Sequence, residues 1–195
     1  MLVLKLGGSL AETGRLNQLC ALVARATAPV IVVPGGGPFA DAVRSAQPAL
    51  AMPEALAHRL ALLAMHQMGL VIGAHAPRFH AVQTVEEIAS ALVLGSIPVW
   101  MPFCLQHDDP TLPADWRTTS DALAARLAER MGGVPVALVK SCPVPAGVTL
   151  TSLTQDGIVD PMFATVVSRA GLDWKVYGGT DEAALTARLG PPADA

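Results

Sequence analysis

Short apolar runs alternate with longer amphipathic segments along most of this chain. The short runs are continuously apolar, which is typical of strands buried on both faces of a parallel sheet. They predict strands at residues 2–6, 30–33, 70–73, 97–101, 135–140 and 174–177. The longer segments place their apolar residues at helical spacing. They predict helices at about residues 15–27, 38–47, 53–68, 84–94, 119–131 and 180–189.

The alternation of strand and helix defines the fold class. It predicts an α/β protein built of parallel βαβ units, with helices on both faces of the sheet. A chain of 195 residues has the length of one domain. We place that domain at residues 1–190 and expect a loose carboxyl-terminal tail at 191–195. Two long connections, 102–118 and 141–160, are rich in proline and polar residues, and such connections are often functional.

Composition excludes several classes of function. The net charge of −3 gives no basic surface for nucleic acid. Charges, glycine or proline interrupt the apolar runs before about 18 residues, so no membrane span is expected. The chain opens directly on a predicted strand, without the pattern of a signal peptide. Three widely spaced cysteines without a CxxC pair fit a cytoplasmic protein, and we expect no metal site made of protein side chains.

Two of the three lysines lie in or directly after an apolar strand. Lys5 interrupts the first run, and Lys140 ends the run that begins at Val136. A buried ammonium without a partner is costly, so each amine should end beside an anion. The alternative is a lysine whose stem packs in the core while its amine reaches solvent. Because both lysines follow the same pattern and glycine loops accompany them, we favour a phosphate-binding site.

Glycines follow the first two predicted strands. Gly7-Gly8-Ser9 comes soon after Lys5, and Gly35-Gly36-Gly37 lies between the second strand and the next helix. Glycine lets backbone N–H groups approach an anion closely, and a helix N-terminus attracts an anion. A plain tight turn is the alternative for either loop. Together with the lysines, the loops predict a nucleotide phosphate site.

Two common nucleotide-binding motifs fit poorly. A P-loop needs a Gly-Lys dipeptide, and the chain contains none. The spacing Gly35-x-Gly37-x-x-Ala40 loosely fits the dinucleotide fingerprint, which requires an acidic residue after the next strand. The predicted strand at 70–73 is followed by Ala74 and His75 instead. A phosphotransferase with these loops would therefore belong to another class.

Carboxylates near the helix at 119–131 supply further candidates. Asp121 falls in its first turn, where the helix dipole alone favours a carboxylate. The functional interpretation places Asp121 between the two lysines, holding their amines in position. The connection before this helix combines acidic residues with Trp116, and a carboxylate with an indole can receive a substrate ammonium. A solvated acidic loop is the alternative.

Other polar residues are weaker candidates for the same edge of the sheet. They are His75, Arg78, His80, Trp100, His107, Asp108, Asp109 and Asp115. The apolar helix at 53–68 contains a further set, which we interpret as core or as a helix–helix interface: His58, Met65, His66 and Met68. Its apolar composition fits a homo-oligomer and a buried core equally well.

The chain resembles the amino acid kinase superfamily, which includes acetylglutamate, aspartate, uridylate and carbamate kinases. The resemblance lies in the order and spacing of Lys5-Leu6-Gly7-Gly8-Ser9, Gly35-Gly36-Gly37-Pro38, Thr119-Ser120-Asp121-Ala122-Leu123-Ala124, Val139-Lys140-Ser141 and Val176-Tyr177-Gly178-Gly179. Segments 60–69 and 112–121 are similar to an archaeal-type branch of methanofuran biosynthesis. That branch phosphorylates (5-(aminomethyl)furan-3-yl)methyl phosphate to the diphosphate.

The resemblance implies a three-layer α/β/α sandwich with a mostly parallel central sheet. It also implies an ATP-dependent kinase acting on a small phosphate monoester, with Mg²⁺ held by the nucleotide phosphates. The expected catalytic residues are Lys5, Asp121 and Lys140. The expected ATP-binding residues are Gly7, Gly8, Ser9, Lys140, Ser141 and Gly147. The expected substrate-binding residues are Gly35, Gly36, Gly37, Asp115, Trp116 and Thr119.

Many members of the superfamily carry a late lysine before the penultimate helix. The corresponding stretch here, 157–163, contains none, so Arg169 or Lys140 is expected to supply the second phosphate-neutralising cation. Two other functions stay open. One is a kinase of the same fold with another acceptor, such as an isoprenyl phosphate, an amino acid or carbamate. The other is a non-catalytic sensor that binds nucleotide through the same loops.

Overall fold

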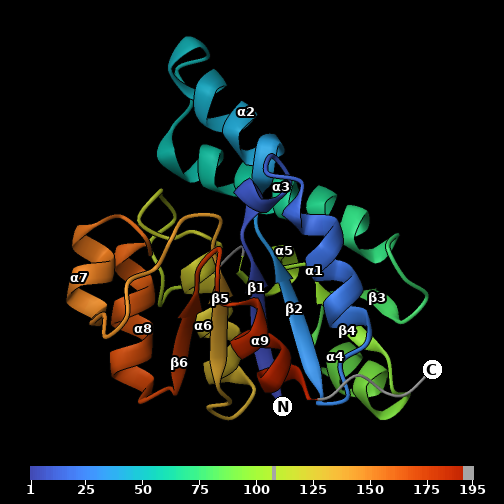
Figure 1. The fold of residues 1–195 in the computed structure, drawn as a ribbon. Helices are drawn as coiled ribbons and strands as arrows, with labels where there is room; N and C mark the ends of the chain where they lie inside the picture. Colours follow the sequence, from blue (N-terminus) through green and yellow to red (C-terminus); the bar gives the residue numbers. More distant parts are fainter. Residues whose placement is uncertain (107–108, 191–195) are drawn as a thin grey trace.

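A computed structural model describes residues 1–106 and 109–190 and places a six-stranded sheet between two layers of helices (Figure 1). The strands are β1 (Leu2–Leu6), β2 (Val30–Pro34), β3 (Phe79–Val82), β4 (Ile97–Trp100), β5 (Val136–Val139) and β6 (Trp174–Tyr177). Their order in the sheet is β3-β4-β2-β1-β5-β6, and each pairing is parallel. The predicted fold class, a three-layer sandwich around a parallel sheet, is confirmed.

Helices connect these strands. They are η1 (Gly8–Leu10), α1 (Arg15–Ala24), α2 (Gly37–Ala49), α3 (Glu54–Gly73), α4 (Val85–Val93), α5 (Phe103–Gln106), α6 (Ser120–Arg130), α7 (Leu150–Gln155), α8 (Pro161–Ala170) and α9 (Glu182–Leu189). Figure 1 shows α2 and part of α3 extending beyond the carboxyl edge of the sheet. These two helices therefore stand above the loops that follow β1 and β2.

Strand β1 divides its side chains between the two helical layers. Leu2, Leu4 and Leu6 pack in the cluster that includes residues of α1 and α9. Val3 packs in the opposite cluster, with residues of α6 and α8. Because side chains alternate along a strand, Lys5 shares the face of Val3 and points toward α6. The single charge in this strand is thus directed at one helix.

The predicted strand at 70–73 is wrong. These residues form the last turn of α3, and the strand is β3, which begins at Phe79. A short apolar run cannot be distinguished from a buried helical segment by its pattern alone. Strand β3 escaped prediction because it lies at the sheet edge and buries only its first and last residues. Helices α7 and α8 were also missed.

This correction moves a group of candidate residues away from the carboxyl edge. Arg78 precedes β3 and donates to the carbonyls of Ala24, Ala26 and Gly95, which lie near the amino ends of the strands. The neighbouring candidates His75 and His80 are exposed around the same end of β3. His107 and Asp108, like the tail at 191–195, lie outside the described residues.

Helix α3 is long and apolar enough, by length and composition, to cross a membrane. It packs instead against α2, β2 and β3, and buries one face as a helix of a folded domain does. Its other face exposes Leu56, Leu63 and Leu70, which are spaced seven residues apart. A homo-oligomer remains a prediction.

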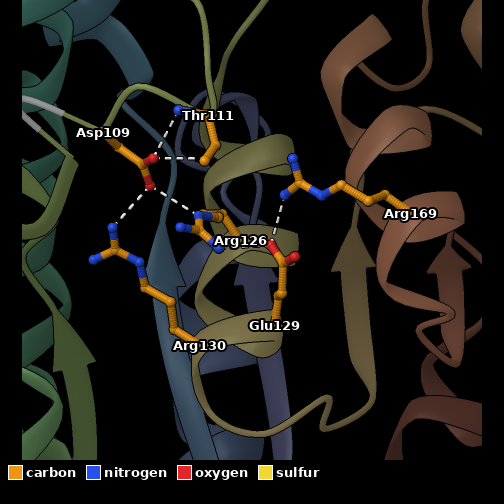
Figure 2. Close-up of polar contacts among 6 residues, drawn as sticks. All are labelled: Asp109, Thr111, Arg126, Glu129, Arg130 and Arg169. Carbon is orange, nitrogen blue, oxygen red and sulfur yellow. Dashed lines mark hydrogen bonds and ion pairs between the residues drawn. The ribbon is translucent and has the colours of Figure 1, made fainter.

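An ion-pair network fixes the connection that leads to α6 (Figure 2). Asp109 accepts hydrogen bonds from Arg126 and Arg130 at 2.8 Å and from the hydroxyl of Thr111 at 2.6 Å. Burial alone would raise the pKa of this carboxyl, but the bonds from Arg126 and Thr111 lower it to about 2. The carboxylate is therefore charged at neutral pH and holds the start of the connection against α6.

We expect Asp109→Asn to lower the free energy of unfolding by about 2 kcal/mol, because two guanidinium groups lose a buried anion. The native pKa of Asp109 lies below the unfolded value of 3.8. Its contribution is thus present above about pH 4 and is lost as the pH falls toward 2. Urea unfolding at pH 7 and pH 3 measures the change. Glu129→Gln, which breaks the more exposed pairs with Arg126 and Arg169, is the matched control.

Candidate active site

Two lysines and one aspartate meet where the strand order of the sheet reverses. Strands β1 and β5 are neighbours, although β2, β3 and β4 separate them in sequence. Lys5 lies near the carboxyl end of β1, and Lys140 directly follows β5. The ammonium of Lys5 lies 2.9 Å from one oxygen of Asp121, and that of Lys140 lies 2.5 Å from the other. Open α/β sheets bind ligands at such a switch point.

The three charges determine one another's ionisation. Burial favours a raised pKa for Asp121, but the charges of Lys5 and Lys140 outweigh it and lower the pKa to about 2. The pKa of Lys5 is lowered, first by burial and also by the charge of Lys140, while Asp121 opposes the change. Both oxygens of Asp121 are directed at lysines, so this carboxylate is poorly placed to accept a proton.

Asp160 is a site residue that the sequence analysis missed. Its Oδ2 accepts the N–H of Thr119 (2.9 Å), the hydroxyl of Thr119 (2.7 Å) and the N–H of Ala122 (3.0 Å). Its Oδ1 accepts the N–H of Phe163 (2.7 Å) and so caps α8. Burial and the charge of Asp121 raise its pKa to about 6. Asp160 thereby joins the starts of α6 and α8 and holds Asp121 in place.

The glycine loops after β1 and β2 pack backbone against backbone. A Cβ on Gly8 would lie 2.2 Å from the nitrogen of Gly37, and one on Gly35 would lie 2.3 Å from the nitrogen of Gly8. No side chain fits at either place. Gly37 also has a φ of 54°, in the left-handed region that favours glycine. The predicted glycines are therefore required by close packing, in addition to any role toward a ligand.

The N–H groups of these loops fall into two sets. Gly7 donates to the carbonyl of Val139 (3.0 Å) and Gly35 to that of Leu6 (2.8 Å), so both serve the sheet. The other set has no acceptor within residues 1–106 and 109–190. It consists of Gly8, Ser9, Gly36 and Gly37, and all four line one cavity. Four free donors around one space suit an anion.

That cavity has a volume of about 220 Å³ and lies between the glycine loops, α2, α3 and the start of α6. Its lining residues are Gly8, Ser9, Gly36, Gly37, Ala40, Asp41, Arg44, His58, Ala61, Leu62, Met65, Trp116, Thr118, Thr119, Ser120 and Leu123. His58 and Met65, which we interpreted as core or interface, thus line this cavity. Asp41 and Arg44 were missed because nothing in the sequence distinguishes them from ordinary surface residues of α2.

The cavity includes two of the three side chains expected to contact a substrate. Trp116 and Thr119 line it, whereas Asp115 does not. The carboxylate of Asp115 instead pairs with Arg117 at 2.7 Å. Asp109 and Trp100, which were also candidates for an acidic and aromatic substrate site, make their contacts elsewhere. Asp109 belongs to the network beneath α6, and the buried Trp100 donates to the carbonyl of Gln83.

The loop after β5 contains two of the residues expected at the nucleotide, Ser141 and Gly147. The hydroxyls of Ser9 and Ser141 are 2.8 Å apart, which links the first glycine loop to the loop after Lys140. Gly147, farther along that loop, borders a different cavity of about 330 Å³, together with Trp174, Lys175 and Asp181. The structure thus brings Ser141 to the glycine loop and places Gly147 apart from it.

A second cation near this loop comes from a residue that we had not considered. Arg169, which we considered beside Lys140, pairs with Glu129 in the last turns of α6 (Figure 2), far along the helix from Asp121. Arg15, at the start of α1, has a buried Nη1 without a hydrogen-bond partner among the described residues. A Cβ on Gly179 would lie 3.5 Å from this nitrogen and 3.8 Å from the carbonyl oxygen of Ser141. Arg15 therefore lies where the loops after β5 and β6 meet.

No group of three or more His, Cys, Asp or Glu side chains placed to hold a metal ion occurs in the described part of the chain. The two buried carboxylates of the site are already committed. Asp121 binds two lysines, and Asp160 accepts four hydrogen bonds. Neither offers a free oxygen pair of the kind that Mg²⁺ prefers.

Comparison with known proteins identifies the family to which the chain belongs. The profile of the amino acid kinase family matches residues 1–142. A relative in Methanocaldococcus jannaschii, [5-(aminomethyl)furan-3-yl]methyl phosphate kinase, is 28% identical over 126 residues. That alignment covers 64% of this chain and 58% of the relative, so the chain spans less than two thirds of the relative's length.

Solved structures show the same fold at low sequence identity. The uridylate kinase of Archaeoglobus fulgidus has a TM-score of 0.66 and 20% identity, covering 98% of this chain and 96% of that one. The carbamate kinase of Giardia lamblia, bound to AMP-PNP, has a TM-score of 0.54 and 12% identity, covering 96% and 95%. With most of its length matched by the family profile, this chain belongs to the amino acid kinase family.

Proposed function

We propose that this protein is a cytoplasmic, ATP-dependent kinase that transfers a phosphoryl group to a small phosphate monoester. The observation that carries the proposal is the Lys5–Asp121–Lys140 cluster at the strand switch point, next to a cavity with free N–H donors. Phosphoryl transfer requires positioning and charge neutralisation more than covalent chemistry. Two oriented cations and a ring of donors supply both.

A phosphate monoester acceptor explains why the site needs no general base. The attacking oxygen of such a monoester is already ionised near pH 7, since its second pKa is about 6. Asp121 has both oxygens directed at lysines and cannot take a proton without releasing them. We infer that Lys5 neutralises the phosphoryl group in flight, while the N–H groups of Gly36 and Gly37 hold the acceptor phosphate.

Mg²⁺ would be held by the nucleotide phosphates, because the two buried carboxylates, Asp121 and Asp160, are engaged with lysines and helix N-termini. Bound there, it would neutralise charge on the phosphates. The protein's own contribution on this side comes from Lys140, Ser9, Ser141 and the N–H of Gly8. A related solved structure carries AMP-PNP, which supports ATP as the donor.

We propose that Arg15 takes the place of the missing late lysine as the second cation at the nucleotide phosphates. A buried guanidinium nitrogen without a partner is unfavourable, and an anion at the meeting point of the loops would satisfy it. Arg15→Gln should raise the KM for ATP roughly tenfold or more and change that for the acceptor little. Arg25→Gln, at the far end of α1, is the matched control. An unchanged KM for ATP would assign Arg15 to the structure of α1.

The acceptor that we favour is (5-(aminomethyl)furan-3-yl)methyl phosphate, in the biosynthesis of a methanofuran-type C1 carrier. The name of the archaeal relative supports this choice. The cavity supports it as well, because it is small and combines polar groups with the indole of Trp116. An isoprenyl phosphate would require a long apolar channel. The charged pair of Asp41 and Arg44 lines the cavity and makes such an occupant unfavourable.

The decisive experiment measures ADP release with Mg-ATP and a panel of acceptors, with ³¹P NMR to identify a diphosphate product. The panel contains the aminomethylfuran monoester, an isoprenyl phosphate, UMP, carbamate and acetylglutamate. We expect turnover with the furan monoester and a new diphosphate signal. Turnover with another member alone would reassign the acceptor. ATP binding without turnover on any of them would favour a nucleotide sensor and reject the kinase.

A further inference from the structure

One face of α2 forms a wall of the acceptor cavity. Gly37, Ala40, Asp41 and Arg44 line this cavity and follow the spacing i, i+3, i+4 and i+7, which places them on one side of the helix. Gly37, with its free N–H, lies at the end nearest Lys5 and the glycine loops. Asp41 and Arg44 lie one and two turns farther out. The wall therefore changes from a phosphate-binding end to a charged end.

The charged end contains a carboxylate with a free oxygen. Among the lining residues that the structure describes, Asp41 is the one acid, and its Oδ1 accepts from Nη1 of Arg44 at 2.9 Å. Its Oδ2 has no partner in the described part of the chain. His58 on the opposite wall has a pKa lowered by burial, so it is uncharged near neutral pH. A cationic group in this cavity would therefore meet Asp41.

Arg44 is held by contacts that do not depend on Asp41. Its guanidinium carbon lies 4.3 Å from the ring centroid of Trp116. The indole nitrogen of Trp116 donates to the side-chain oxygen of Gln47 at 2.6 Å. Arg44 can therefore keep its place over the indole while Asp41 accepts a second donor. The Asp41–Arg44 pair is more than half exposed, and such pairs contribute little stability that a competing cation must overcome.

We propose that Asp41 binds the ammonium group of the acceptor and makes the enzyme selective for aminated phosphate monoesters. This inference rests on the function proposed above. The name of the archaeal relative describes an acceptor with an aminomethyl group at one end and a methyl phosphate at the other. A carboxylate at one end of the cavity and free N–H donors at the other match these two charges.

The spacing along α2 fits an acceptor of this size. Asp41 lies four positions after Gly37, which corresponds to about 6 Å along a helix. A five-membered ring with a one-carbon arm on either side spans such a distance. Leu62 and Met65 also line the cavity and offer apolar contacts for the ring. The buried hydroxyl of Thr118 also lines the cavity and has no partner among the described residues, so it can donate to a ring oxygen.

The test compares two acceptors that differ in one group: the aminomethyl monoester and its hydroxymethyl analogue. The wild-type protein should show a higher kcat/KM for the amine. Asp41→Asn should reduce this preference roughly tenfold or more, mainly through KM, because a neutral amide cannot pair with the ammonium. Asp41→Glu should retain part of the preference. Asp156→Asn removes the same charge from an exposed position directly after α7 and should leave the preference unchanged.

Arg44→Gln separates direct binding from an indirect role. If Asp41 acts only by holding Arg44, this variant will abolish the preference as Asp41→Asn does, and the inference is overturned. If Asp41 contacts the ammonium, the preference will persist in Arg44→Gln. A wild-type protein that uses both acceptors equally also overturns the inference, yet leaves the kinase proposal intact. A wild-type protein that phosphorylates neither acceptor overturns the inference, and it overturns the kinase proposal as well only if no other member of the acceptor panel is phosphorylated.

Discussion

Replacing Lys5 with methionine should lower kcat by about three orders of magnitude, the effect of losing a preorganised group that stabilises developing charge. The amine of Lys5 is buried and lies 2.9 Å from Asp121, so it is held in one position before substrate arrives. A methionine of similar length fills the space without a charge. The loss should therefore appear in kcat, while the KM for ATP changes less, because Lys140 and the glycine loop remain. The ADP-release assay measures it with saturating acceptor.

Lys175→Met is the matched control for this variant. Lys175 is an exposed lysine on β6, at the edge of the same sheet, and its loss should leave kcat within a factor of about two of wild type. Lys5→Met should stay folded, since a buried cation is replaced by an apolar side chain while Asp121 keeps Lys140. Near-normal kcat in a folded Lys5→Met protein would show that the lysine cluster is structural and would remove the basis of the proposed mechanism.

The central residues of the site could be predicted because each differs in type from the residues that surround it in the sequence. A lysine within an apolar strand requires an anion, and Asp121 supplies it at 2.9 Å. Adjacent glycines require close backbone contact or positive φ; Gly8 and Gly35 show the close contact, and Gly37 shows the positive φ. Each of these structural requirements can be recognised in the sequence from a single residue and its neighbours. The parallel order of the strands then brings the residues together.

The walls of the cavity could not be predicted in the same way. His58 and Met65 lie on α3 among leucines and alanines, and their pattern is that of a packed helix. They line the cavity because α3 extends past the sheet edge, which depends on long-range packing against α2 and β2. Asp41 and Arg44 have the polarity of ordinary surface residues. Only the position of α2 over the glycine loops places them opposite Trp116.

Asp160 could have been found from the sequence. An aspartate directly before a proline, followed by an amphipathic run, is a typical start of a helix, and α8 begins at Pro161. We treated residues 141–160 as a connection and therefore overlooked this signal. Its second role, accepting two N–H groups and a hydroxyl from the start of α6, could not be predicted. That role depends on α6 and α8 packing side by side.

Asp121→Asn should reduce kcat by about a thousandfold or more, because the amide cannot hold two ammonium groups in position. It should also lower the free energy of unfolding by about 3 kcal/mol, since two buried cations lose their shared anion. The native pKa of Asp121 is about 2, below its ordinary value of 3.8. The stability difference from wild type should therefore be full above about pH 4 and disappear as the pH falls toward 2. Urea unfolding across this pH range measures it.

The pH dependence of kcat distinguishes an orienting role for Asp121 from a purely structural one. In the native protein, burial lowers the pKa of Lys5 and Asp121 partly restores it. Without the carboxylate, the pKa of Lys5 falls further, and the amine loses its proton at a lower pH. The alkaline fall of kcat in Asp121→Asn should therefore begin at lower pH than in wild type, in protein that circular dichroism shows to be folded.

Thr119→Ser is the control, because it keeps the hydroxyl that donates to Asp160. In this variant the alkaline fall of kcat should begin at the same pH as in wild type. The opposite result is a folded Asp121→Asn protein whose kcat is near that of wild type and begins to fall at the same alkaline pH. It would mean that the carboxylate only starts α6 and that the two lysines are oriented by other groups.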